Sequence, residues 1–144
     1  MDINWLSLIL AAIVPTVTGM IWYSKPLFQK PWMESIGMTE EKMKSANMAV
    51  ISIISLVTAF LIAFFLLNFN NGPGQEAEYD TFGHGAAHGL VLTVFLVMPI
   101  LVSKGLYEQV GWKGMLIAVA YWGITLAIMG GIVDAMNHWP NVAQ

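Results

Sequence analysis

This chain of 144 residues has no cysteine and no arginine, and only 10% of its residues are charged. The lack of cysteine excludes a disulfide framework and thiolate chemistry. A soluble domain usually has about 25% charged residues, whereas this chain is 57% hydrophobic. It therefore lacks the polar surface that a soluble domain of its size would need. It also has no basic patch of the kind that binds nucleic acid, so a nucleic-acid partner is not expected.

What the chain has instead is four long apolar stretches, at about 5–23, 48–67, 85–102 and 112–136. Each is close to the roughly 20 residues that cross a hydrocarbon core about 30 Å thick. Helices are expected, because in lipid each backbone polar group must be satisfied within its own segment. The sequence predicts one all-α domain over residues 1–144, an integral membrane four-helix bundle with spans at about 4–24, 46–68, 83–103 and 112–136.

The basic residues are confined to the first and third connections between these stretches. They are Lys25, Lys30, Lys42, Lys44, Lys104 and Lys113. Cytoplasmic loops carry the excess of Lys and Arg, so both connections are predicted to be cytoplasmic and both termini to lie outside (N-out, C-out). The second connection, the predicted outer loop at about 69–82, has only acidic charges. These are Glu76, Glu78 and Asp80.

The first connection, at about 26–45, mixes aromatic and charged residues and is expected to lie along the cytoplasmic interface. Thr39 followed by Glu40 and Glu41 is a helix-start signal, a side-chain cap followed by acids that complement the helix dipole. From this point a helix is expected to run unbroken to about Asn68. Its roughly 30 residues would span about 45 Å, so its first turns should project into the cytoplasm.

Three of the spans have small residues at helical spacing. These are Ser52, Ser55, Ala59 and Ala63 in the second, Gly85 and Gly89 in the third, and Gly123, Ala127 and Gly130 or Gly131 in the fourth. Small residues let helix backbones approach closely in lipid. They are expected to form packing contacts within the bundle, and self-association through one of them is the alternative.

The ionisable residues of the spans gather at the ends away from the lysines. His84 and His88 are four residues apart, as are Asp134 and His138, so each pair lies on one helix face. His84 stands 20 residues before Lys104, and Asp134 stands 21 residues after Lys113. Each separation corresponds to about 30 Å of helix. His84 and Asp134 are therefore predicted to be level near the outer boundary, with His88 one turn deeper.

Two imidazoles and a carboxylate are ligand types of zinc and similar divalent ions. The candidate metal ligands are His84, His88 and Asp134, with His138 as an extra ligand. The spacing is only moderately specific, because the zincin motif has a Glu directly after its first His and this chain does not. Structural or interfacial roles for the same groups, and proton or ion handling, remain open. Serines such as Ser7 have no His near their depth, so no catalytic residue is predicted.

The first third of the chain carries a recognisable motif. It consists of Asn4-Trp5-Leu6, Gly19-Met20-Ile21-Trp22-Tyr23-Ser24-Lys25-Pro26-Leu27-Phe28, Lys30-Pro31-Trp32-Met33 and Gly37-Met38-Thr39-Glu40-Glu41. The motif resembles the start of the domain-of-unknown-function family numbered 1761, whose members are similar in length with four predicted spans. The resemblance implies a membrane bundle and adds no catalytic role. Physically, the motif's aromatic residues either position the cytoplasmic hairpin or form a docking surface for a partner or a lipid headgroup.

Two functions follow as hypotheses. The first is a non-enzymatic membrane protein that acts by assembly, as a homo-oligomer or as an accessory subunit of a membrane complex. The second is an outer-face protein that binds a metal or small ligand through His84, His88 and Asp134. A membrane enzyme, the third alternative, would have to use the same cluster. Besides a second copy or a membrane protein partner, the chain is expected to contact the lipid bilayer. Its small size and the family resemblance favour a multi-pass protein of the bacterial inner membrane.

Overall fold

The computed structural model describes residues 3–69 and 79–138, which form helices and no strand. Within these residues four helices are long and apolar enough to cross a membrane. They are α1 (Trp5–Trp22), α4 (Met48–Leu66) with the 3-10 turn η1 (Leu67–Phe69), the helix Phe82–Tyr107, and α8 (Trp112–Met136). The prediction of an all-α membrane bundle is confirmed. Its N-out, C-out orientation stays a prediction, and Glu76 and Glu78 of the predicted outer loop lie outside the described residues.

The third membrane helix has three parts, α6 (Phe82–Leu92), the π-helical turn η2 (Thr93–Val97) and α7 (Met98–Tyr107), which we call the α6–α7 helix. Pro99 lies two residues after the end of the π turn. Proline lacks the N–H of a regular helix and its ring crowds the carbonyl four residues earlier, and a π turn is one way for a helix to widen at such a point. The turn falls in the middle of the membrane span.

The first connection forms two short helices, α2 (Gln29–Ile36) and α3 (Glu40–Ser45). The Thr39 cap is confirmed, since its side chain accepts a hydrogen bond from Lys42 N. The expectation of one unbroken helix from Thr39 to Asn68 is wrong, because α3 ends at Ser45 and a new helix begins at Met48. Asn47 causes the break. Its side chain accepts from Val50 N and caps α4, a position that asparagine prefers to a helix interior.

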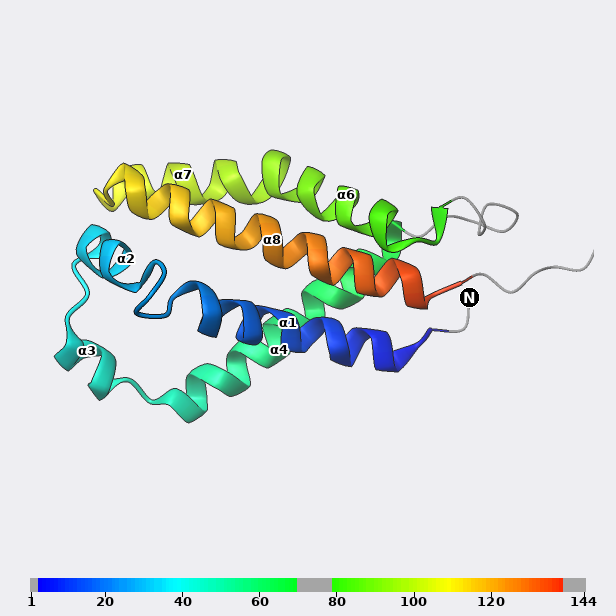
Figure 1. The fold of residues 1–144 in the computed structure, drawn as a ribbon, viewed down its shortest axis with the longest axis horizontal. Coiled ribbons are helices and arrows are strands. Elements are labelled where there is room, and N and C mark those ends of the chain that lie inside the picture. The colour runs from blue at the N-terminus through cyan, green and yellow to red at the C-terminus, as the bar shows by residue number, and fades with distance from the viewer. Residues whose placement is uncertain (1–2, 70–78, 139–144) are drawn as a thin grey trace, which may run out of the picture.

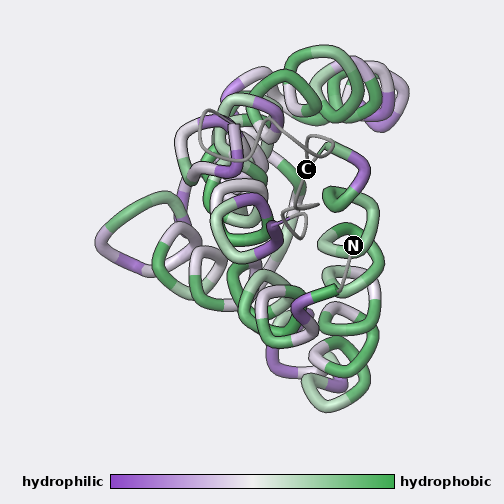
Figure 2. Tube along the Cα trace, turned by 90° about the vertical axis from the view of Figure 1, so that its right-hand side faces the viewer, coloured by the Kyte–Doolittle hydropathy of each residue, from purple (hydrophilic) through white to green (hydrophobic). Residues whose placement is uncertain are grey.

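The described helices place all the lysines at one end of the bundle (Figure 1). We call this the lysine end; it holds α2, α3, the end of α7 and the start of α8. The opposite, lysine-free end holds the starts of α1 and α6 and the end of α8. α4 crosses the other membrane helices obliquely, behind α1 in the view of Figure 1. Seen from the lysine-free end, the tube is mostly hydrophobic along the helices (Figure 2).

Burial is concentrated in the half of the bundle nearer the lysine-free end. The core consists of Leu8, Ala11, Val14, Ala63, Leu66, Leu126, Met129 and Val133. The small residues of α4 divide along the same line: Ala59 and Ala63 are buried, whereas Ser52 and Ser55 toward the lysine end are exposed. Small-residue packing is therefore confirmed for the half of α4 that packs on α1, and the other half lies open.

Candidate ligand site at the lysine-free end

The contact between α6 and α8 depends on glycine. Gly85 and Gly89 are buried against the backbone of α8, where a Cβ on either would overlap the carbonyl oxygens of Gly130 and Leu126, respectively. A Cβ on Gly130 would in turn overlap the carbonyl of Gly85. This backbone-to-backbone approach is how small residues let membrane helices pack. It also brings the polar side chains at the ends of the two helices together.

The first turn of α6 sets the position of the first histidine. Thr81 is the N-cap, and its hydroxyl accepts a hydrogen bond from the backbone N–H of His84. A Thr cap satisfies a backbone donor that has no partner inside the helix. His84 therefore lies in the first turn and His88 one turn further along, on the same face. The predicted level of His84 and Asp134 is confirmed, because their side chains meet.

Asp134, His84 and His88 form a hydrogen-bonded chain. Nδ1 of His84 lies 2.6 Å from Oδ2 of Asp134, and Nε2 of His84 lies 3.1 Å from Nε2 of His88. An ionised carboxylate can only accept, so His84 donates through Nδ1 and its Nε2 faces the second ring. Asp134 is 3% exposed, and its Oδ1 has no hydrogen-bond partner among the described residues.

A second carboxylate at this end pairs with the third histidine. Asp80, directly before the cap of α6, is buried, and its Oδ2 lies 3.2 Å from Nδ1 of His138. Its Oδ1, like that of Asp134, has no partner in the part of the chain that the structure describes. Asp80 also lies close enough to Asp134 for their charges to repel each other. The structure thus brings His84, His88 and Asp134 together and pairs His138 with Asp80 instead.

Charge balance at this end depends on imidazoles. Every lysine of the chain lies at the opposite end and arginine is absent, so no basic side chain of the Lys or Arg type is available to Asp80 or Asp134. Removing a carboxylate from water without a countercharge is costly. A proton on a histidine, or a bound cation, is what can supply that charge here. Such groups in a membrane protein indicate function by default.

The remaining polar contacts at this end are structural. Asn4 donates through its backbone N–H to Oδ1 of Asn137 and through its side chain to the carbonyl of Met136. Asn137 in turn donates to the hydroxyl of Ser7. This network ties the start of α1 to the end of α8. It also places Ser7 at the end of the bundle that holds the histidines, so the expectation that no His lies near the depth of Ser7 is wrong. Asn4 opens the family-like motif and is the N-cap of α1. Nothing in the sequence marked Asn137 or Asp80 as buried residues of this end.

The rest of the motif lies at the lysine end, where it holds the first connection against the bundle. Nε1 of Trp22 donates to the carbonyl of Ile117 on α8, and its ring packs on Phe28 at 4.6 Å between centroids. The ring of Tyr23 lies between those of Trp32 and Tyr121, at 5.0 and 5.2 Å. Burial, with Tyr121 alongside, raises the pKa of Tyr23 to about 12. These contacts match the interpretation that the motif positions the hairpin.

Metal binding is limited by the position of the carboxylates. Among the described residues no group of three or more His, Asp or Glu side chains could together hold a metal ion. Asp134 explains this, because it contacts Nδ1 of His84, on the opposite side of the ring from Nε2. A metal between the imidazoles would therefore have two nitrogen ligands from the described residues, and Asp134 would orient one of them.

Comparison with known protein families matches residues 6–133 to the family described as protein of unknown function (DUF1761). Comparison with curated proteins and with solved structures gives no match. The matched segment includes His84 and His88 and ends one residue before Asp134.

Proposed function

The chain belongs to the DUF1761 family and has four helices long and apolar enough to cross a membrane, and we propose that it binds a divalent metal ion of the zinc type at its lysine-free end. The ligands are the Nε2 atoms of His84 and His88. The observation that carries the proposal is the 3.1 Å between these two atoms. Two nitrogens on one tetrahedral zinc, each about 2.0–2.1 Å from the metal, are about 3.4 Å apart. A small adjustment of the rings therefore admits the ion.

Asp134 supports this use of the pair. A histidine that binds a metal through one ring nitrogen usually donates its other N–H to a carboxylate or carbonyl, which fixes the tautomer and makes the ligand more basic. Nδ1 of His84 makes this contact with Asp134 at 2.6 Å. The ion would also balance the buried carboxylates of Asp134 and Asp80. Water or a solute would complete its coordination, which leaves positions open to a ligand.

Zinc titration of the detergent-purified protein, stripped with a chelator, tests the proposal. Wild type should bind one equivalent, and His88→Ala should lower the affinity at least about tenfold through loss of one of two protein ligands. His138→Ala is the matched control, because His138 pairs with Asp80 rather than with the imidazole pair. Equal binding by wild type and His88→Ala, or binding by neither, would remove the proposal.

Assembly is the second candidate function, and the open half of α4 favours it. Ser52 and Ser55 are exposed on α4, a helix made mostly of apolar residues. Membrane helices associate through small and hydroxyl side chains. A second copy or a membrane partner would cover them. The mass of the complex in mild detergent decides: an oligomer that Ser55→Leu dissociates supports assembly, and a monomer without a partner contradicts it.

A further inference from the structure

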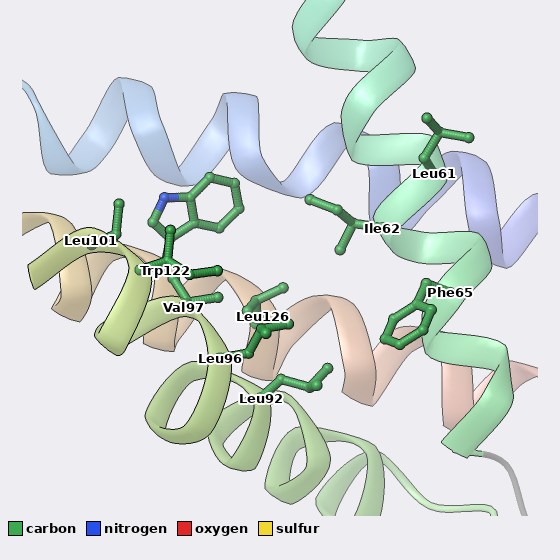
Figure 3. Close-up of a pocket in the computed structure, with 10 residues that line it drawn as sticks. Leu61, Ile62, Phe65, Leu92, Leu96, Val97, Leu101, Trp122 and Leu126 are labelled. Atoms are coloured by element: carbon green, nitrogen blue, oxygen red, sulfur yellow. The ribbon is translucent and has the colours of Figure 1, made fainter. Parts of the chain in front are cut away.

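An apolar groove runs between α4 and the α6–α7 helix. Its volume is about 470 Å³, within the roughly 300–1,000 Å³ of small-molecule sites. Figure 3 shows Phe65 of α4 facing Leu92 and Leu96 of the α6–α7 helix, with Trp122 and Leu126 contributed by α8. Every residue that lines it is apolar or aromatic. A site with these walls takes hydrocarbon rather than a polar solute.

The groove is aligned with the helices and leads toward the histidines. Leu92, Leu96 and Ile100 line it at intervals of four residues, and His88 stands four residues before Leu92. Residues at this interval lie on one side of a helix. From His88 to Ile100 the helix rises about 18 Å. The lined part from Leu92 to Ile100 accounts for about 12 Å of this rise, and the histidines lie beyond its Leu92 end.

Aromatic rings connect the groove to the imidazole pair without a gap. Phe65, which lines the groove, packs edge-on against Phe69 at 5.7 Å between ring centroids. Phe69 in turn stacks on His88 at 5.1 Å, with an angle of 29° between the ring planes. Nε2 of His88 bonds to His84. Its Nδ1 has no hydrogen-bond partner among the described residues. His88 does not itself line the groove, so a ligand would have to extend past Phe69 to reach this nitrogen.

We propose that the groove binds the chain of a long-chain fatty acid, with its carboxyl group at Nδ1 of His88. A groove of about 470 Å³ accommodates one hydrocarbon chain, which favours a single-chain lipid. When Nε2 of His88 accepts from His84, its Nδ1 carries the N–H, which is a donor for a carboxylate. No acidic side chain lines the groove. The two carboxylates of this end, Asp80 and Asp134, already face imidazoles of their own. The inference goes beyond the metal site and does not require the metal.

Photolabelling of the protein in phosphatidylcholine nanodiscs, in buffer containing a chelator, tests this inference. The probe is a long-chain fatty acid with a diazirine either near its methyl end or near its carboxyl end. The methyl-end probe should label residues near Ile100, and the carboxyl-end probe residues near Phe65 and Leu92. An excess of unlabelled fatty acid should compete with both. A reversed pattern would overturn the placement of the carboxyl group.

Neighbouring substitutions separate groove binding from general contact with lipid. Leu96→Trp fills the groove and should abolish competable labelling. Phe95→Trp is the matched control, because Phe95 is 77% exposed and does not line the groove; it should label as wild type. His88→Ala should weaken competition roughly tenfold, as expected for loss of a hydrogen bond to a charged group. Equal labelling of the Leu96 and Phe95 variants would overturn the proposal. So would a lack of labelling by either probe in wild type, the result expected if a second copy of the chain covers the groove.

Discussion

The two ends of the bundle are held together by different interactions. At the lysine-free end, Gly85 and Gly130 bring helix backbones into direct contact, and buried polar groups join separate helices. At the lysine end, α4 lies apart, and a hollow of about 580 Å³ between it and α1 extends to Tyr23 and Trp32. Contacts there combine aromatic rings with a close approach of α2 to α8 at Gly114. One end buries polar groups between tightly packed helices, and the other has an open hollow beside α4.

This difference shows where chemistry can occur in a chain with few charges. A buried carboxylate needs a fixed partner, and only tightly packed helices hold one at 2.6 Å. The aromatic contacts of the lysine end tolerate small shifts, because they involve large surfaces rather than a single bond. Four substitutions or conditions test the comparison.

The largest effect is expected from Gly85→Ala. The added methyl group overlaps the carbonyl of Gly130, which is backbone and cannot move aside cheaply. We expect the free energy of unfolding, measured by denaturant titration in detergent, to fall by about 3 kcal/mol. Gly83→Ala is the control, since a Cβ there meets no atom within 4 Å, and it should leave stability unchanged or raise it by up to about 1 kcal/mol. Similar losses in both variants would contradict the backbone contact.

Asp134→Asn should separate stability from binding at the same end. The amide keeps the shape of the side chain and can still accept from His84, so the fold should be retained. Loss of the charge that orients the imidazole should weaken zinc binding about 10–100-fold, measured by titration. Asp80→Asn serves as control, because the imidazole partner of Asp80 is His138. The zinc affinity of this variant should change much less. Equal losses would mean that Asp134 acts only through its general negative charge.

Trp22→Phe tests how the lysine end is held. The substitution keeps an aromatic ring against Phe28 but removes the Nε1–H bond to the carbonyl of Ile117. A net loss of about 1 kcal/mol in the free energy of unfolding is expected. Trp112→Phe changes a 64% exposed ring on the same side and should have almost no effect. A loss as large as that of Gly85→Ala would show that this end is not the more tolerant one.

The smallest effect is expected from high pH acting on Tyr23. Its pKa is raised from 10.0 to about 12 in the folded protein by burial and by Tyr121, so folding favours the neutral phenol. The resulting stabilisation is complete below pH 10 and is lost as the pH rises through about 12. The unfolding temperature of wild type should therefore fall more steeply between these values than that of Tyr23→Phe. Parallel curves would show that the ring is not buried as described.

Particular residues show how far the sequence allowed the site to be predicted. Counting from the lysines was enough to put His84 and Asp134 at one level, since helices have a fixed rise per residue. The same counting also placed His138 at this end, but not its partner. Asp80 was grouped with the acidic loop, because a residue next to a turn shows no periodicity from which its burial could be inferred. The break at Asn47 was not predicted, because the only signal for it is one capping residue directly before the long apolar stretch that forms α4.

The sequence by itself determined that this is a membrane bundle of four helices, because length, hydropathy and the one-sided lysines are properties of composition and spacing. It also determined which helix faces carry histidine and glycine. Only the tertiary structure decided that the glycines of α6 lie on the backbone of α8, that His84 bonds Asp134 and not His138, and that Phe69 links the histidines to a groove. These depend on how far helices approach and rotate against each other, which is set by contacts between residues as many as 133 positions apart.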